Sequence, residues 1–414
     1  MKIGIIGLGY VGLPLAVAFA QAGQTVQGVD VDVSKVAALA AGESYVEDIQ
    51  SSVLRSLGDA FTASTRYADL ANADAVLICV PTPLTANREP DLTPLLDATR
   101  ALAAVLGRGQ LIVVESTTYP GTTRERLAPL LEESGLGLGR DFNLAFSPER
   151  IDPGRTDFTI RTTPKVVGGV TNECLRRAVE LYSIVCDTVV PVSTTDAAEL
   201  TKLLENIFRS VNIALVNEMA IIADRMSIDI WEVVDAAATK PYGFMRFEPG
   251  PGMGGHCLPV DPFYLSWRAR EFDLAAGFVE LAGTVNQGMP LFCVEKIGHA
   301  LNAHAKPFNG SRIALMGVSY KAGVGDMRES PAIKIIRLLQ ERGVDLVYHD
   351  PYVPELREFG LASTGFDDAL ADADAVVIIT RHPELDVDRV VDEAPLVVDF
   401  RGATRANQAN VVRL

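Results

Sequence analysis

A glycine-rich turn near the start of the chain has the spacing of a phosphate-binding loop. Gly7, Gly9 and Gly12 follow a short β-branched run and precede an alanine-rich stretch. In such a loop the first glycine permits a tight turn, the second lets backbone approach a pyrophosphate, and the third lets a helix pack close to a strand. The helix N-terminus then attracts the phosphate. The pattern predicts a dinucleotide site, and the alternative is an ordinary glycine-rich turn.

An acidic residue supports this prediction and indicates which dinucleotide is bound. Asp30 ends the next strand-like run, at about the 20-residue distance that is typical of these sites. A carboxylate there accepts hydrogen bonds from the ribose hydroxyls and repels a 2′-phosphate. We therefore expect NAD rather than NADP. The alternative is that Asp30 is only a solvated carboxylate at the end of a strand.

A second glycine-rich stretch, residues 250–261, surrounds Cys257. Glycines let other groups approach a sulfur closely, as covalent catalysis by a cysteine requires. Asp261 is four residues further on and would share a helical face with Cys257 if a helix began there. The alternative is a small buried hydrophobe in a tight loop, and local sequence does not separate the two interpretations.

Other polar residues have weaker local signals. Lys202 and Asn206 are spaced i, i+4 in a helical stretch, which locally favours a solvated face with Glu199 and Lys202 as an exposed pair. Glu149 follows a hydrophobic run and is either functional or a salt-bridge partner in a loop. The histidines show no metal-ligand spacing, so we expect no metal; they are His256, His299, His304, His349 and His382.

The elements that must position these residues form three segments. Over about residues 1 to 190, short β-branched runs alternate with helical patterns, which predicts a parallel, doubly wound sheet. The expected strands are 2–7, 25–30, 75–80 and 111–116, with a helical stretch at 92–106. The uncharged apolar run at residues 3–20 contains several glycines and Pro14, so it fits a strand, turn and helix better than a signal peptide.

The middle segment predicts a long, well-buried helix that begins near residues 193–196, which favour helix N-caps. Its apolar side chains recur at helical spacing, and the helical signal continues through 228–238. The long helix is also a candidate dimer element. The apolar positions are Leu200, Leu203, Leu204, Ile207, Phe208, Val211, Ala214 and Leu215.

The third segment begins near Ser311 and repeats the pattern of the first. Strands are expected at 312–317 and 345–350, with a helix at 332–341, and residues 371–376 echo the sequence of 72–76. The predicted fold is α/β, with two Rossmann-like doubly wound parallel-sheet domains flanking a central helical domain. The predicted boundaries are 1–193, 194–303 and 304–414.

Composition limits the classes of function. The chain has 414 residues with a net charge of −16, which argues against a nucleic-acid partner, and a composition of 48% hydrophobic and 22% charged residues excludes wholesale disorder. The five cysteines are scattered without a CxxC pair, which favours a reducing cytoplasm. No other uncharged apolar stretch is long enough to span a bilayer, so we expect no membrane association.

The motifs together resemble the UDP-glucose/GDP-mannose dehydrogenase family, in order and over essentially the whole chain. They are residues 7–12 with Pro14, Val80–Pro83, Glu115–Thr117, Ser147–Glu149, Glu199–Asn206, Gly254–Cys257 and Lys321–Ser330. The resemblance implies a four-electron oxidation of a sugar C6 alcohol to a carboxylate, with two NAD reduced per turnover and a homodimeric, cytoplasmic enzyme of surface-polysaccharide or related glycan synthesis.

The resemblance also assigns roles to residues. Cys257 would be the nucleophile, forming a thiohemiacetal and then a thioester; Lys202 would stabilise oxyanion charge; and Asn206, Asp261, Glu149 and Thr117 would assist the reacting hydroxyl and water. Cofactor contacts would come from Gly7, Gly9, Tyr10, Val11, Gly12, Asp30, Lys35, Thr82, Thr117 and Arg328. Substrate contacts would come from Glu149, Arg150, Lys202, Asn206, Gly250, Gly252, Gly254, Tyr320 and Lys321.

The sequence around Cys257 is most similar to the enzymes that act on UDP-N-acetylglucosamine, because His256 stands where UDP-glucose enzymes usually carry serine. UDP-N-acetylmannosamine and UDP-glucose stay open as substrates. Two other classes are alternatives: a one-step hydroxyacid dehydrogenase, which needs no cysteine, and a catalytically silent nucleotide-binding regulator.

Overall fold

The structure is a computed structural model of the 414-residue chain that describes residues 1–46, 48–85, 87–151, 157–255 and 258–414. The chain forms two compact units. The first consists of Met1–Glu205 with Phe263–Ala275, and the second of Asn206–Pro262 with Ala276–Leu414. The division into three domains stays a prediction.

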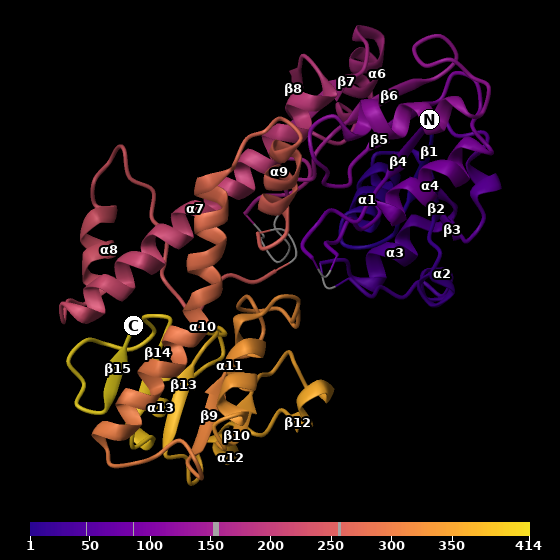
Figure 1. The fold of residues 1–414 in the computed structure, drawn as a ribbon. Coiled ribbons are helices and arrows are strands. Elements are labelled where there is room, and N and C mark those ends of the chain that lie inside the picture. The colour runs from indigo at the N-terminus through magenta and orange to yellow at the C-terminus, as the bar shows by residue number, and fades with distance from the viewer. Residues whose placement is uncertain (47, 86, 152–156, 256–257) are drawn as a thin grey trace. The chain divides into compact units, whose positions relative to one another are not determined.

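The first unit is built on one eight-stranded sheet in the order β3-β2-β1-β4-β5-β6-β7-β8 (Figure 1). Neighbouring strands are parallel, except that β6 and β7 are antiparallel. The four strands predicted from the sequence are confirmed, and each ends one or two residues earlier than expected. The strands are β1 (Lys2–Ile6), β2 (Thr25–Val29), β3 (Phe61–Ser64), β4 (Ala75–Ile78), β5 (Leu111–Val114), β6 (Asn143–Phe146), β7 (Lys165–Gly169) and β8 (Val189–Val192).

Helices join these strands as the alternating pattern predicts. α1 begins at the third glycine of the loop, α2 is capped by the Asp32 carboxylate, and α6 is capped by the Thr171 hydroxyl. The strand order reverses between β1 and β4, which is where an open α/β sheet binds its ligand at the carboxyl ends of the strands. The helices are α1 (Gly12–Gln21), α2 (Val33–Ala40), α3 (Ser51–Leu57), α4 (Thr93–Ala103), α5 (Ala128–Glu132) and α6 (Asn172–Tyr182).

The second unit contains a five-stranded parallel sheet in the order β10-β9-β13-β14-β15 (Figure 1). Its strands are β9 (Arg312–Met316), β10 (Asp345–His349), β13 (Ala375–Ile378), β14 (Val397–Asp399) and β15 (Val411–Arg413), beside a hairpin of β11 (Glu355–Leu356) and β12 (Leu361–Ala362). Its helices are α8 (Ile230–Ala238), α10 (Gly277–Ala303), α11 (Pro331–Gln340), α12 (Phe366–Leu370) and α13 (Val387–Glu393). Two helices, α7 (Thr195–Arg225) and α9 (Asp261–Arg270), continue from one unit into the other.

The sequence echo between residues 72–76 and 371–376 corresponds to a structural repeat. Asp74 Oδ2 accepts the N–H of Lys2 at 2.7 Å, and Asp374 Oδ2 accepts the N–H of Arg312 at 2.9 Å. Each aspartate precedes the strand that pairs with the first strand of its own sheet. The two α/β units thus share local hydrogen bonding as well as topology.

The long helix α7 has 31 residues and begins where the sequence predicts. The expectation that it is well buried is wrong for part of its length. Leu203 and Ala214 are buried, but Leu204 is 63% exposed and Leu215 is 55% exposed. The apolar side chains of α7 therefore extend beyond the face that the rest of the chain buries. Even so, no helix among the described residues is long and apolar enough to cross a membrane.

Candidate functional site

The three glycines of the first loop differ in what surrounds them. Gly7 follows β1 with φ +88°, donates its N–H to the Val29 carbonyl at 2.8 Å, and leaves no room for a side chain, since a Cβ would lie 2.6 Å from the Cys79 carbonyl oxygen. A Cβ on Gly12 would lie 1.9 Å from the Gly7 oxygen. A Cβ on Gly9 would meet nothing within 4 Å. The loop is therefore tight at both ends and open in the middle, where a pyrophosphate needs room.

Asp30 is buried at the end of β2, beside this loop. Its Oδ2 accepts the N–H of Leu8 at 2.8 Å and lies 3.8 Å from Lys35 Nζ, while its Oδ1 accepts the N–H of Asp32 at 2.9 Å. These contacts hold the carboxylate in place and bring Lys35 to it. Tyr45, which the sequence analysis did not single out, donates its hydroxyl to the Leu8 carbonyl at 2.6 Å and closes the same side of the loop.

Thr82 and Thr117 lie together after β4 and β5. The Thr82 hydroxyl donates to the Thr117 carbonyl at 2.8 Å, and the Thr82 carbonyl accepts the Tyr264 hydroxyl at 2.8 Å. Both threonines follow strands next to the point where the strand order reverses. In the first unit, the residues at the carboxyl ends of β1, β2, β4 and β5 therefore lie along the same side of the sheet. They are Gly7–Gly12, Asp30, Thr82 and Thr117.

Glu149 belongs to a buried group of charges. Lys165 Nζ lies 2.7 Å from Glu115 Oε2 and 3.3 Å from Glu149 Oε2. Tyr182 donates its hydroxyl to the other oxygen of Glu115. Because charges are rarely buried unless they are paired, Lys165 is what allows two carboxylates to share this interior. Glu149 therefore forms a salt bridge, with Lys165, which was one of the two interpretations that the sequence allowed.

The same contacts set the ionisation of this group. Burial opposes the charged form of Glu149, but the Lys165 ammonium, the Ile151 N–H and the charge of Lys202 outweigh it and hold the pKa of Glu149 below its usual value. Burial raises the pKa of Glu115, which Lys165 only partly offsets. Glu149 is thus a carboxylate at neutral pH, able to accept a proton.

Neither Glu115 nor Lys165 was assigned a role from the sequence, although Glu115 stands in a family motif. One signal for Lys165 was available in the sequence. Lys165 begins an otherwise apolar stretch that is buried as β7, and a buried lysine needs an acidic partner. The sequence does not show which residue that partner is, because Glu115 lies 50 residues away.

The solvated-face interpretation of the long helix is wrong for three of its polar residues. Glu199, Lys202 and Asn206 are all buried. Glu199 accepts the N–H of Gly121 at 2.7 Å and both the N–H and the hydroxyl of Thr123, at 2.9 Å and 2.7 Å. Burial raises the pKa of Glu199 to about 7, against the effect of these donors. Glu199 fastens the helix to the loop after β5.

Arg150 also lies in the first unit, where Nη2 is 2.7 Å from Glu205 Oε1. In the second unit, Asn206 donates its side-chain N–H to Asp261 Oδ2, and both side chains are buried. The helix α9 begins at Asp261 itself, and the expected shared face of Cys257 and Asp261 lies outside the described residues. Asn206 helps to orient Asp261.

The glycine stretch before the cysteine packs against a segment of the second unit. A Cβ on Gly254 would lie 2.6 Å from the Tyr320 Cβ, and one on Gly255 would lie 3.0 Å from Tyr320 Cε2. Gly255, at φ +88°, donates its N–H to the Arg328 carbonyl at 3.0 Å. His256 and Cys257, the expected nucleophile, lie outside the described residues.

Upstream glycines anchor the same stretch. The N–H of Gly250 donates to Asn217 Oδ1 at 2.9 Å, and Gly252 has φ +136°. The Arg328 guanidinium pairs with Asp326, with Nη2 2.6 Å from Oδ2. The structure thus brings Gly250, Gly252, Gly254, Tyr320 and Arg328 into one unit, while Lys202, Glu149 and the glycine loop lie in the other.

Within the described part of the chain, no group of three or more histidine, cysteine, aspartate or glutamate side chains is arranged to hold a metal ion.

The glycine loop after β1 and the carboxylate at the end of β2 are the features of a Rossmann-type NAD-binding domain. Three models of the UDP-glucose/GDP-mannose dehydrogenase family match the chain: the NAD binding domain at residues 1–186, the central domain at 196–288 and the UDP binding domain at 314–406. The chain belongs to this family, as the sequence motifs predicted, and is an NAD-dependent nucleotide-sugar dehydrogenase.

Relatives with different substrates are similar to nearly the same degree. The UDP-N-acetyl-D-mannosamine dehydrogenase of Pyrococcus horikoshii is 34% identical over 98% of this chain and 100% of its own length. The UDP-N-acetyl-D-glucosamine 6-dehydrogenase of Pseudomonas aeruginosa is 35% identical over 93% of this chain and 91% of its own. Among solved structures, the UDP-D-ManNAc dehydrogenase of P. horikoshii has a TM-score of 0.91 at 32% identity, covering 100% of this chain and 98% of that one.

Proposed function

We propose that the protein oxidises the C6 hydroxyl of a UDP-hexose to a carboxylate in two successive two-electron steps, with UDP-N-acetylglucosamine as the preferred substrate. One observation carries the proposal. Gly254 and Gly255, which lead directly into Cys257 in the sequence, pack against Tyr320 in the part of the chain that matches the UDP binding domain. A cysteine that follows such a contact is suited to react with a sugar held through its UDP.

The residues of the chain divide the chemistry among them. NAD, held by Gly7–Gly12 and Asp30, accepts one hydride in each oxidation when it is bound. Cys257 adds as a thiolate to the aldehyde formed first, which gives a thiohemiacetal, and the second oxidation leaves a thioester. Lys202 stabilises the negative oxygen in these steps.

Water then hydrolyses the thioester, which releases the carboxylate product and regenerates the thiol. Glu149 is suited to remove the proton of that water, because Lys165 and Lys202 keep it ionised. Asp261, oriented by Asn206, is a second proton acceptor. Thr117, fixed by Thr82, would border the cofactor and the water.

The choice of sugar is the finer part of the proposal. The relative of P. aeruginosa and the sequence around Cys257 support UDP-N-acetylglucosamine, whereas the relative of P. horikoshii supports UDP-N-acetylmannosamine as the second candidate. UDP-glucose is a third. Incubation with NAD and each UDP-sugar should give two NADH per sugar consumed with one of them. No NADH with any UDP-hexose would contradict the proposal.

A cysteine variant separates this proposal from the alternatives. Cys257→Ser should bind NAD and UDP-sugar normally but fail to form the carboxylate. A one-step hydroxyacid dehydrogenase would keep its full turnover in this variant. A catalytically silent regulator would bind both nucleotides in the unchanged protein and produce no NADH at all.

We further propose that the protein acts as a homodimer in the cytoplasm and serves glycan synthesis. We also propose that it consists of an NAD-binding, a central and a UDP-sugar-binding domain.

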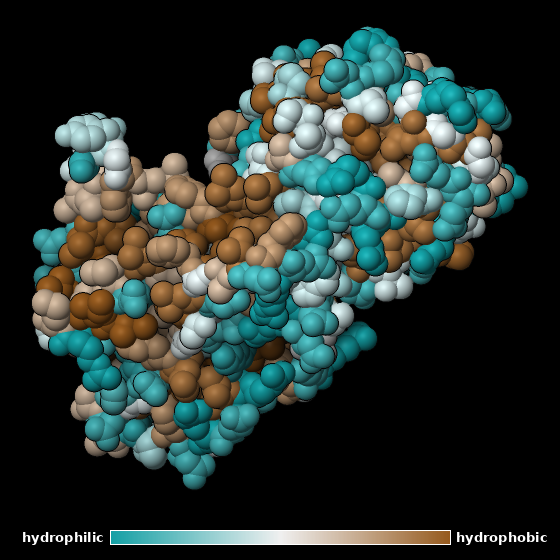
Figure 2. Space-filling view, turned by 45° about the horizontal axis from the view of Figure 1, so that its top comes forward, coloured by the Kyte–Doolittle hydropathy of each residue, from teal (hydrophilic) through white to brown (hydrophobic). Residues whose placement is uncertain are grey.

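In the second unit, α7 carries an exposed apolar stripe. Figure 2 shows hydrophobic side chains gathered on the surface that α7 and α8 form. We call these residues the α7 stripe: Phe208, Leu215, Met219 and Ile222. They repeat along one helical face, which suits a second copy of the chain.

A further inference from the structure

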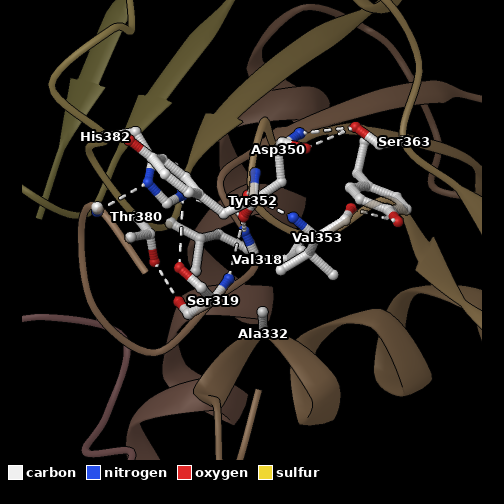
Figure 3. Close-up of polar contacts among 12 residues, drawn as sticks. Val318, Ser319, Ala332, Asp350, Tyr352, Val353, Ser363, Thr380 and His382 are labelled. Carbon is white, nitrogen blue, oxygen red and sulfur yellow. Dashed lines mark hydrogen bonds and ion pairs between the residues drawn. The ribbon is translucent and has the colours of Figure 1, made fainter. Parts of the chain in front are cut away.

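One histidine that the proposed mechanism does not use is buried at the carboxyl end of the second sheet. His382 follows β13, and its ring contacts two different segments (Figure 3). The N–H of Gly323 lies 3.1 Å from His382 Nδ1, and Asp350 Oδ2 lies 3.0 Å from Nε2. The ring also lies near Tyr352, with centroids 4.9 Å apart.

These partners define the tautomer of the ring. A backbone N–H only donates, so Nδ1 must be the unprotonated nitrogen that accepts from Gly323. Nε2 then carries the hydrogen and donates it to the Asp350 carboxylate. The neutral imidazole therefore links Asp350 at the end of β10 to the loop that contains Gly323. Nε2 donates to Asp350, and Nδ1 accepts from Gly323.

Asp350 is the counterpart of Asp30 in the structural repeat. Asp30 Oδ2 accepts the N–H of Leu8, and Asp350 Oδ2 accepts the N–H of Val318 at 2.7 Å. Both carboxylates also accept the N–H of the residue two positions on, Asp32 in the first unit and Tyr352 in the second. In the second unit, however, Asp350 accepts further donors: the N–H groups of Ser319 and Val353 and the His382 ring. The lone pairs that a dinucleotide fold offers to a ribose are used here to hold His382.

The segment that His382 holds carries the expected substrate contacts. The Thr380 hydroxyl donates to the Ser319 carbonyl at 2.6 Å, and the Ser319 hydroxyl donates to the Lys321 carbonyl at 2.8 Å. With the bond from Gly323 to His382, both ends of residues 319–323 are held by the segment that follows β13. Figure 3 shows Ser319 between Thr380 and His382. Tyr320 lies between these ends and packs against Gly254 and Gly255.

We propose that His382 is a positioning residue for the UDP-sugar: through Asp350 on one side and Gly323 on the other, it preorganises residues 319–323 and with them Tyr320 and Lys321. This inference rests on the proposed function, because it takes those two residues as substrate contacts. A loop held in its bound conformation before binding costs less ordering entropy when the ligand arrives. His382 thus contributes to affinity without touching the ligand.

Two substitutions separate the two tasks of the ring. His382→Asn puts an amide oxygen near the place of Nδ1, so it can still accept from Gly323. His382→Gln puts its amide near the place of Nε2, so it keeps the bond to Asp350 and loses Gly323. We expect His382→Gln to weaken binding of UDP, measured by calorimetry, about tenfold, and His382→Asn to weaken it much less. Affinity for NAD should be unchanged in both variants.

UDP serves as the probe because its binding does not depend on turnover. If no UDP-sugar were oxidised, the proposed function would fail while the UDP titrations still tested His382. Equal UDP affinity in both variants and the unchanged protein, or an equal loss in both at matched thermal stability, would overturn the inference.

If a variant does not fold, nitrogen NMR of the unchanged protein with labelled histidine gives the test. The expected result is a neutral His382 ring with its hydrogen on Nε2. A hydrogen on Nδ1 would overturn the inference.

Discussion

At the scale of single residues, the chain keeps its buried charges ionised by pairing them. Without a cation, Glu149 would tend to be protonated in an apolar interior, and Lys165 supplies that cation at 3.3 Å. Asp30 is held by the N–H groups of Leu8 and Asp32. In both cases the group that would do chemistry is held by a neighbour that does none.

Replacing the buried lysine tests this dependence. In Lys165→Met, burial would be opposed only by Lys202 and the backbone N–H groups, so the pKa of Glu149 should rise and the acidic limb of the kcat–pH profile should move to higher pH by about one unit or more. Lys165→Arg keeps the positive charge and should leave the limb near its original place. The measurement is NADH formation from pH 5 to 9 at saturating substrates.

Two effects would argue against this account. An unchanged acidic limb in Lys165→Met would mean that Glu149 does not limit turnover. A shift of equal size in Lys165→Arg would mean that the cation is not what matters. Because Lys165→Met leaves two carboxylates without their partner, we also expect it to lower the free energy of unfolding by about 3 kcal/mol.

The acid at the end of β2 should set the cofactor preference. Asp30→Asn removes the charge that repels a 2′-phosphate and weakens the grip on the ribose, so the ratio of kcat/KM for NADP to that for NAD should rise roughly tenfold. The matched control is Asp32→Asn, which removes the same charge two residues away and keeps a side chain that caps α2. A preference altered equally by both variants would assign the effect to net charge.

At the scale of elements, the sequence predicted where strands and helices begin better than what lies against them. β1, β2, β4, β5 and α7 were recognised because their periodicity is local. The antiparallel pairing of β6 with β7, the pairing of Lys165 with Glu115, and the burial of Lys202 were not, because each depends on contacts between distant parts of the chain. Exposure of Leu204 and Leu215 was missed for the same reason, since periodicity marks an apolar face but not its partner.

The attachment of α7 to the loop after β5 should depend on pH. The pKa of Glu199 is raised to about 7 from an ordinary value of 4.5, so the folded state binds this proton more tightly than the unfolded state. The contribution of Glu199 to stability is therefore full below pH 4.5 and falls as pH rises towards 7, by on the order of 3 kcal/mol.

Denaturant unfolding of the unchanged protein and Glu199→Gln, from pH 5 to 8, measures this dependence. Since glutamine does not titrate, the difference in unfolding free energy between the two should fall across the window. Glu218→Gln, on an exposed side chain of the same helix, is the control and should give a constant difference. A constant difference for Glu199→Gln as well would contradict the prediction.

At the scale of the whole molecule, the α7 stripe predicts association. A charge at its centre, in Leu215→Glu, would have to be buried without a partner in a dimer, so this variant should be monomeric at micromolar concentration. Light scattering after size-exclusion chromatography gives the mass. Val190→Glu, on an exposed apolar side chain of β8 outside the stripe, should keep the mass of the unchanged protein, and equal masses for all three would exclude the stripe as the interface.

The repeated fold has a consequence for how the enzyme keeps its two ligands apart. NAD and a UDP-sugar both contain a ribose joined to a diphosphate, so one scaffold used twice risks binding each at the other's site. The aspartate at the end of the second strand is partly available in one copy and occupied by His382 and backbone N–H groups in the other. We expect this difference to separate the two ligands: UDP should compete with the sugar nucleotide and not with NAD, so accumulating UDP should slow the enzyme through one ligand alone.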